Sequence, residues 1–254
     1  MATDVVYLLG CGSSRGDAEL RWSLRSIAKH ARNLGRVVVV GEKPGWVDWT
    51  RVEHVPFEEK GPSKHHNMAA KVMAVIDEGV VDRGFLLSSD DHVYIADADF
   101  DRYPVYFRGD LKSEAEYGDS PVSKYRRSLV DTKRVLEEFG YPSMCFHGHV
   151  NTHIEPECAD AVREMLAVEP GARYGYEITD LFMNVLATRY DFDAVARPDV
   201  KLKAYGSDGG AEALRERLRG YDCFSYGDAA LDDGLDALLD RMFPDLCEYE
   251  RRRP

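Results

Sequence analysis

The chain has 254 residues, 44% of them hydrophobic, enough to bury a substantial core as one large α/β domain or a domain with a helical addition. Its net charge of −12 excludes broad electrostatic binding to nucleic acid or to an anionic membrane, because both need a positive protein surface. The five cysteines are scattered without a C-x-x-C pair and no apolar run reaches about 18 residues, so we expect a cytoplasmic protein with reduced thiols and no stable membrane insertion.

The first predicted elements are a strand and a helix joined by a glycine-rich turn. Residues 5–9 are an apolar run typical of a strand, and Gly10 and Gly12 follow it. This turn suits close backbone approach to a ligand, but it lacks the third glycine of a dinucleotide-binding fingerprint. Apolar residues then recur with helical spacing, with Asp17 as the predicted cap and Gly35 as the predicted stop.

The next elements continue the alternation of strand and helix. The β-branched run 36–41 is too short for a helix and predicts a buried parallel strand, which completes a βαβ unit. A helix is predicted over 67–78, and residues 85–87 predict a central strand that is covered on both faces. The first 100 residues therefore alternate as half of a Rossmann-type fold does.

After Asp101 the sequence is rich in tyrosine, arginine and polar residues, with Pro104 and Pro121 as breakers. We interpret residues 103–127 as loops and short strands. No repeat, low-complexity tract or linker divides the chain, so residues 1–254 are predicted to form a single domain. Helices are predicted over 129–139, 156–168, 211–218 and 231–242, with a further apolar segment at 178–187.

Two adjacent carboxylates, Asp90 and Asp91, stand at the end of the predicted strand 85–87. We expect them at the carboxyl edge of the sheet, where open α/β sheets bind ligands. Two uncompensated carboxylates repel each other, and a divalent cation such as Mg²⁺ or Mn²⁺ with phosphate oxygens on its far side relieves that repulsion. A polar turn without a metal is the alternative interpretation.

Short motifs along nearly the whole chain resemble the Stealth sugar-phosphate transferases and their glycosyltransferase-like relatives in bacteria and phages. The first match is residues 19–27 (ELRWSLRSI), followed by a valine-rich strand and a Pro-x-Trp at residues 44–46. Later matches, in the same order as in that family, are residues 64–67 (KHHN), 87–91 (LSSDD), 146–149 (FHGH), 224–228 (FSYGD) and 243–250 (FPDLCEYE). The chain departs from the family pattern at Ser89, Asn151 and Gly227.

The resemblance implies a GT-A-like fold: a Rossmann-type open mixed sheet flanked by helices, with C-terminal helical additions. Residues 1–100 would be the donor-binding half and residues 101–254 the acceptor-side half. The implied reaction transfers a sugar or sugar phosphate from a nucleotide-sugar donor to a hydroxyl acceptor. A UDP-sugar is the donor that we expect first. That acceptor would be a glycan or a modified base in phage DNA. A modified base is the only role that we expect for nucleic acid.

Donor binding needs fixed cations around the departing phosphate. Arg21 and Arg25 lie one turn apart on the predicted helix, so both could reach one diphosphate, although a solvated helix face is the alternative. Lys64 and Asn67 stand at the start of the next helix, whose amino end favours anions. They could equally be a solvent-exposed lysine and a helix cap.

The acceptor hydroxyl must lose a proton, and His149 is the leading candidate for the general base because imidazole titrates near neutral pH. Asp180 is the second candidate, and Asp91 is predicted to be catalytic as a metal ligand. The resemblance also implies Asn184 and Lys201 as contacts to the acceptor or to phosphate, with Lys201 in a D-x-K-L segment at residues 199–202.

Two other functions remain open from the sequence. The histidines and carboxylates could bind two metals, as in a phosphoesterase. The chain could also be a catalytically silent binding module that keeps the fold, because fold alone does not establish function. Most of the eight histidines would then be exposed or hydrogen-bonded structural residues. The candidate metal ligands of the phosphoesterase are His65, His66, Asp90, Asp91, His92, His147, His149 and His153.

Overall fold

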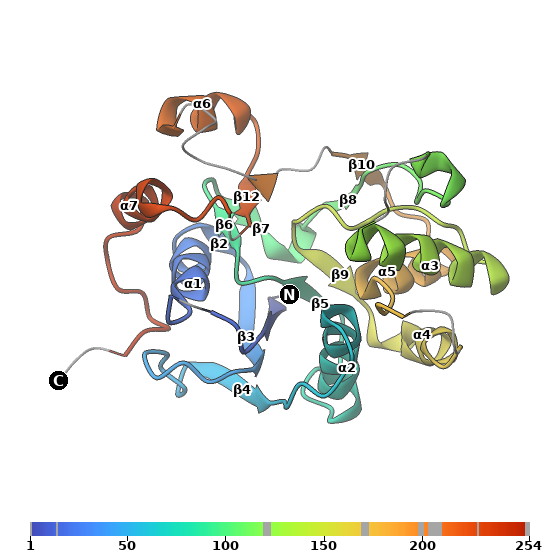
Figure 1. Cartoon of the computed structure of the whole chain (residues 1–254). Coiled ribbons are helices and arrows are strands. Elements are labelled where there is room, and N and C mark those ends of the chain that lie inside the picture. Colours follow the sequence, from blue (N-terminus) through green and yellow to red (C-terminus); the bar gives the residue numbers. More distant parts are fainter. Residues whose placement is uncertain are drawn as a thin grey trace.

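The computed structural model describes residues 2–13, 15–118, 123–168, 173–197, 201–202, 210–227 and 229–251, except the side chain at position 215. Its centre is a five-stranded sheet in the order β4-β3-β1-β5-β9 (Figure 1). Four strands are parallel and β9 pairs antiparallel to β5, so the predicted α/β fold with an open mixed sheet is confirmed. The strands are β1 (Thr3–Leu9), β3 (Leu34–Gly41), β4 (Val52–Pro56), β5 (Phe85–Ser88) and β9 (Thr152–Ile154).

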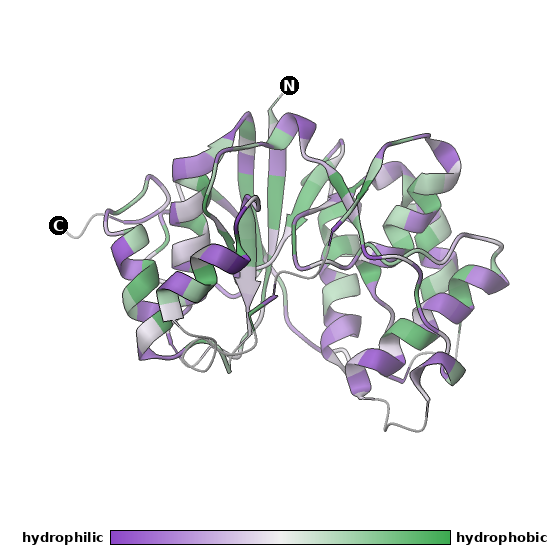
Figure 2. Cartoon of the chain, turned by 90° about the horizontal axis from the view of Figure 1, so that it is seen from above, coloured by the Kyte–Doolittle hydropathy of each residue, from purple (hydrophilic) through white to green (hydrophobic). Residues whose placement is uncertain are grey.

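Helices cover both faces of this sheet (Figures 1 and 2). Val5 and Tyr7 of β1 pack on one face and Val6 on the other, and all three are fully buried. Burial on both sides explains why β1 and β3 are continuous apolar runs rather than alternating ones. The first face carries α1 (Ala18–His30) and α7 (Asp233–Met242), and the second carries α2 (Lys64–Asp77), α3 (Lys124–Glu138), α4 (Ala159–Leu166) and α5 (Ile178–Arg189).

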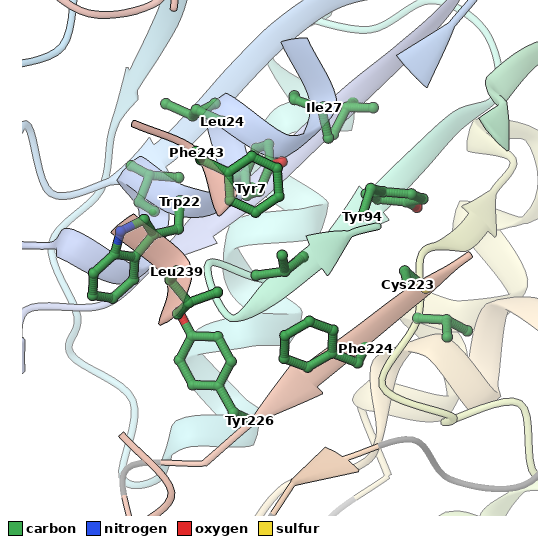
Figure 3. Packing of buried hydrophobic residues seen from close by; sticks show 14 of the residues in the cluster. Tyr7, Trp22, Leu24, Ile27, Tyr94, Cys223, Phe224, Tyr226, Leu239 and Phe243 are labelled. Carbon is green, nitrogen blue, oxygen red and sulfur yellow. The ribbon is translucent and has the colours of Figure 1, made fainter. Parts of the chain in front are cut away.

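A small sheet extends the core on the first face. Its middle strand, β12 (Cys223–Tyr226), lies between β11 (Lys201–Leu202) and β6 (His92–Tyr94). Figure 3 shows the aromatic side chains of β12 within the buried cluster that α1 and α7 also enter. The remaining elements are β2 (Ala31–Arg32), β7 (Ala98–Asp99), β8 (Val105–Phe107), β10 (Ala194–Ala196), α6 (Gly210–Arg217) and three short 3₁₀ helices at Phe100–Arg102, Ala115–Tyr117 and Pro156–Cys158.

The helices predicted from apolar spacing are confirmed with shifted ends. The segment 156–168 divides into a 3₁₀ turn and α4, and the apolar segment 178–187 is α5, of which the first nine residues are buried. In the described part of the chain, no helix is both long enough and apolar enough to cross a membrane. Pro121, predicted as a breaker, lies outside the described residues.

The predicted start of the first helix is confirmed, since Asp17 directly precedes α1, but the predicted stop is wrong. Asp17 adopts a left-handed conformation with φ 58° and its side chain makes no capping hydrogen bond. The helix ends at His30, and Gly35 lies within β3. A Cβ at Gly35 would stand 2.4 Å from Oδ1 of Asp4, which accepts the backbone N–H of Arg36. This glycine therefore permits close approach of two strands and does not stop the helix.

A buried ion pair joins the last described segment to α1. The guanidinium of Arg25 contacts both carboxylate oxygens of Glu250, at 2.6 and 3.0 Å, and donates to the carbonyl of Phe243 at 2.8 Å. Nε of Arg21 lies 3.3 Å from the same carboxylate, whose side chain is only 3% exposed. Two arginines one turn apart on α1 therefore hold the C-terminal segment against the first face of the sheet.

We expect Arg25→Ala to destabilise the fold by about 3 kcal/mol, because it leaves the buried Glu250 carboxylate without its two-point partner. Urea denaturation measures the loss. The control is Arg32→Ala, whose ion pair with Asp97 is exposed, and which should cost less than about 1 kcal/mol. Equal effects of the two variants would contradict the structural role of Arg25.

Candidate active site

The candidate site lies where the order of strands reverses. From β1 the chain passes first to β3 and β4 on one side and then to β5 on the other, so β1 and β5 flank the topological switch point. Open α/β sheets bind ligands at the carboxyl ends of the strands at such a point. Asp90 and Asp91 form the turn between β5 and β6, so the sequence prediction of their position is confirmed.

The two carboxylates have opposite electrostatic surroundings. Burial and the charge of Asp91 raise the pKa of Asp90 to about 7. Burial also opposes ionisation of Asp91, but the nearby His92 and Lys201 lower the pKa of Asp91 below its usual value. Nζ of Lys201 lies 3.5 Å from Oδ2 of Asp91. Among the described residues, no ion pair is found for Asp90.

The carboxylate pair fits a divalent cation shared with a substrate. Across the described ranges, no three side chains of His, Cys, Asp or Glu converge as a metal cluster would. Mg²⁺ is commonly held by one or two carboxylates together with substrate phosphates and water, so two carboxylates suffice for that mode of binding. The raised pKa of Asp90 indicates that the charge of Lys64 does not offset the effects of burial and of Asp91. The donor set therefore fits a substrate-linked metal and not a closed cage of protein ligands.

Cationic and imidazole groups surround the pair. The charge of Lys64, at the start of α2, lowers the pKa of Asp90, and the charge of His149 lowers that of Asp91. His149 adopts a left-handed backbone conformation with φ 54°. Nδ1 of the buried His92 lies 3.2 Å from Oδ1 of Asn151, and burial lowers the pKa of His92 to about 4. The structure thus brings together Asp90, Asp91, Lys64, Lys201 and His149 of the predicted site.

Two residues at which the chain departs from the predicted motifs lie beside neighbours of Asp91. Asn151, at a position where that pattern has proline, is the hydrogen-bond partner of His92. Gly227, where the pattern has asparagine, passes close to Lys201, because a Cβ there would lie 3.2 Å from Cε of that lysine. Asn151 and Gly227 therefore each lie beside a residue that neighbours Asp91. Asp228, Asp199 and Val200 of the matched segments lie outside the described residues.

A hollow of about 580 Å³ opens at the carboxyl ends of β1, β3 and β4, and the Asp90–Asp91 turn follows β5, the strand next to β1 in the sheet. Its floor is held by the buried Lys71, whose Nζ donates to the carbonyl of Leu9 at 2.7 Å and to Glu59. Gly10 and Gly12 belong to the turn after β1, but a Cβ at Gly12 would have nothing within 4 Å. A role of these glycines in ligand binding stays a prediction. The hollow is lined by Leu9, Cys11, Gly41, Glu42, Pro56, Phe57, Glu58 and Glu59.

Several other predicted donor contacts are engaged within the protein. Arg21 and Arg25 do share one helix face, but that face meets Glu250 and Trp46 and not the Asp90–Asp91 turn. The side chain of Arg25 is 11% exposed and its guanidinium already carries three hydrogen bonds, so this geometry does not support the predicted diphosphate contact, which stays a prediction. Oδ1 of Asn67 accepts the backbone N–H of Gly61 at 2.7 Å, which makes it a brace for the loop before α2.

Asp180 and Asn184 are fully buried on α5 and support the loop before β9. Oδ1 of Asp180 accepts the backbone N–H groups of Phe146 and His147, at 2.6 and 3.0 Å. The side chain of Asn184 bonds to both the N–H and the carbonyl of Met144. Neither side chain reaches solvent, so this geometry does not support Asp180 as the base or Asn184 as a ligand contact.

Glu177 is a buried acid that no sequence motif singled out. It lies at the start of α5, is 1% exposed, and stands between His65 and His147. Its only local signal is a glutamate between the apolar residues Tyr176 and Ile178, at the beginning of an apolar helix. Such a residue is almost never fully buried unless it is paired, and the sequence alone did not reveal its partners.

No known family model matches the chain, and no curated protein matches it. The Stealth resemblance therefore depends on the short motifs alone and stays a prediction. The site is defined by its geometry, because the structure places the Asp90–Asp91 pair, Lys64, Lys201 and His149 around the end of one strand.

We expect Asp90→Asn to stabilise the metal-free protein above pH 7. The pKa of Asp90 is raised to about 7 in the fold, so ionisation of Asp90 costs stability as the pH rises from about 4 to that value. The gain should be about 1–3 kcal/mol above pH 7, and it should vanish near pH 4. Thermal denaturation across pH measures it.

Mg²⁺ or Mn²⁺ provides the matching control. The metal should stabilise the wild-type protein and should have little effect on Asp90→Asn, because the amide is a much weaker ligand than the carboxylate. A variant that is less stable than wild type at pH 8 without metal would contradict the assignment of Asp90 as an uncompensated carboxylate.

Proposed function

We propose that this protein is a metal-dependent transferase that moves a sugar or sugar phosphate from a nucleotide-sugar donor to a hydroxyl acceptor, with a GT-A-like fold related to the Stealth family. The observation that carries the proposal is the Asp90–Asp91 pair at the switch point, in which Asp90 makes no ion pair with the described residues and keeps a raised pKa. A phosphate-bound divalent cation is the ligand that such a pair suits best.

The hollow at the carboxyl ends of β1, β3 and β4 supports a nucleoside diphosphate as part of the donor. Its apolar lining includes Phe57 and Pro56, and its size is typical of small-ligand sites. The carboxylates of Glu42, Glu58 and Glu59 are suited to accept hydrogen bonds from ribose hydroxyls and repel phosphate. The diphosphate would therefore lie away from the hollow, toward the Asp90–Asp91 pair, Lys64 and Lys201.

The residues around the pair support each part of the transfer. Asp90 and Asp91 would hold the metal, which supplies charge stabilisation to the departing phosphate when it is bound. Lys64 and Lys201 add fixed positive charge on the same edge of the sheet. The acceptor hydroxyl gives its proton to an imidazole of the loop before β9, for which the sequence predicts His149.

A two-metal phosphoesterase has less support. It needs several histidines and carboxylates arranged around two ions. His65 and His147 instead contact Glu177, and His153 bonds to the carbonyl of Tyr103 at 2.7 Å. The candidate ligands are thus distributed over separate contacts, and no cluster of three is found in the described part of the chain.

The proposal is tested by thermal denaturation of the full chain with a panel of nucleotide sugars, including UDP-glucose and UDP-N-acetylglucosamine, with and without Mn²⁺. A true donor at 100 times its Kd should stabilise the fold by about 2.7 kcal/mol, or several degrees in Tm. The shift should require metal. Stabilisation by metal alone, together with hydrolysis of a generic phosphoester, would favour the phosphoesterase.

Asp91→Asn should abolish turnover and leave the fold intact, because a metal ligand at a strand end contributes little to the core. The loss should be at least about a hundredfold, the scale on which losing charge stabilisation acts. Release of nucleotide from the donor measures turnover, and Tm provides the check on folding. Near-normal turnover in the presence of metal would remove Asp91 from the site.

A further inference from the structure

Glu177 is a buried carboxylate held between two imidazoles. Its Oε2 lies 3.3 Å from Nδ1 of His65, and its Oε1 lies 3.5 Å from Nδ1 of His147. The three side chains come from the start of α2, the loop before β9 and the start of α5. A carboxylate at Nδ1 orients an imidazole and leaves Nε2, on the other side of the ring, to exchange a proton.

The surrounding residues fix this arrangement. The backbone N–H of Glu177 donates to Oγ1 of Thr132 on α3 at 2.8 Å. Oδ1 of Asp180, one turn further along α5, accepts the backbone N–H of His147 at 3.0 Å. The first turn of α5 therefore holds both the backbone and the ring of His147. His65 is held differently, with its Nε2 3.3 Å from the hydroxyl of the buried Ser128.

The ring of His147 lies at the border of the candidate active site. Its side chain is 18% exposed, whereas that of Glu177 is 1% exposed. The ring centroid stands 4.6 Å from that of His149, whose charge affects Asp91. Tyr125, which is 37% exposed, flanks it at 5.7 Å. His147 therefore connects a buried acid to the edge of the sheet where the acceptor must lie.

The pKa shifts of Glu177 and His147 agree with this geometry. Burial opposes ionisation of Glu177, but the two histidines hold its pKa well below the usual range. Burial alone would lower the pKa of His147, yet the Glu177 carboxylate raises it. A stronger base accepts a proton from a hydroxyl more readily, provided that it is neutral when the substrate binds.

We propose that His147 and Glu177 are the acid–base centre of the acceptor side: His147 takes the proton of the acceptor hydroxyl, and Glu177 is a positioning residue that acts through it. This inference rests on the proposed transferase function. It moves the base from His149, the residue predicted from the sequence, to the histidine that has a buried carboxylate behind its ring.

The transfer is balanced in atoms and charge. The acceptor O–H bond breaks and its proton goes to Nε2 of His147. The acceptor oxygen forms a bond to the transferred carbon or phosphorus atom. The bond from that atom to the bridging phosphate oxygen breaks, and its electron pair leaves with the nucleotide. Glu177 stabilises the imidazolium formed in this step and does not itself take the proton.

The coupling is tested without substrate by NMR titration of the histidines in the full chain. His147 should titrate above its ordinary pKa in the wild type, and its pKa should fall in Glu177→Gln because the carboxylate charge is lost. The matched control is Thr132→Val, which removes the hydrogen bond to the Glu177 backbone but keeps the carboxylate, and which should leave the pKa of His147 unchanged. An unchanged pKa in Glu177→Gln would overturn the coupling. The other groups that act on this pair are His65, Arg108, Tyr125, Cys145, His149 and Asp180.

The catalytic role is tested by turnover of the UDP-sugar that stabilises the protein with Mn²⁺. His147→Asn should lower kcat by about a hundredfold or more and leave the donor KM nearly unchanged. Glu177→Gln should lower kcat less and shift the acidic limb of the pH–rate profile to lower pH, because the base becomes weaker. A merely structural effect would change the amount of folded protein without moving that limb.

Comparison with His149→Asn decides between the two histidines. If His149→Asn has the larger loss of kcat while His147→Asn stays near wild type, the inference is wrong even though the transferase function stands. If no nucleotide sugar binds or turns over, the proposed function fails and the catalytic role of His147 fails with it. Should Glu177→Gln not fold, the His147→Asn and His149→Asn pair still gives this decision.

Discussion

Burial of negative charge is the constraint on which the arrangement of this structure depends. The chain carries a net charge of −12, and several of its carboxylates lie inside the fold. An isolated buried charge costs several kcal/mol, so each such carboxylate needs a cation or a proton. Arg25 pairs with Glu250 and Arg36 pairs with Asp4. Two histidines contact Glu177. These pairs connect segments that are far apart in the sequence.

Two acids, the half-buried Asp90 and the fully buried Asp180, do not follow that pattern. The pKa of both Asp90 and Asp180 is raised to about 7, because each is buried next to another carboxylate, Asp91 and Glu177 respectively. Asp180 is compensated by two backbone N–H groups, which suits a structural brace. Asp90 faces the open carboxyl edge of the sheet instead. An acid with a raised pKa at the edge of the sheet where ligands bind is what supports the proposed cation at this position.

Local patterns predicted the parts of the fold that depend on local physics. Apolar runs and helical spacing located β1, β3, β5 and the principal helices, and the end of an apolar run located Asp90 and Asp91. The roles of Arg25 and Glu177 could not be predicted in this way. Glu250 is 225 residues from Arg25 in the sequence, and His65 and Glu177 lie on separate helices. Spacing along one helix showed that the two arginines share a face, but not what that face contacts.

The direction of β9 joins the two parts of the candidate site. Leu87 near the carboxyl end of β5 pairs with Thr152 at the amino end of β9, because these strands are antiparallel. The histidine loop, residues 147–151, precedes β9 and therefore reaches the same edge as Asp90 and Asp91. A parallel β9 would place that loop at the opposite end of the sheet, some four residues or about 13 Å away. One reversed strand thus brings the histidine loop and the carboxylate pair to one edge, which is the arrangement that the proposed transfer would require.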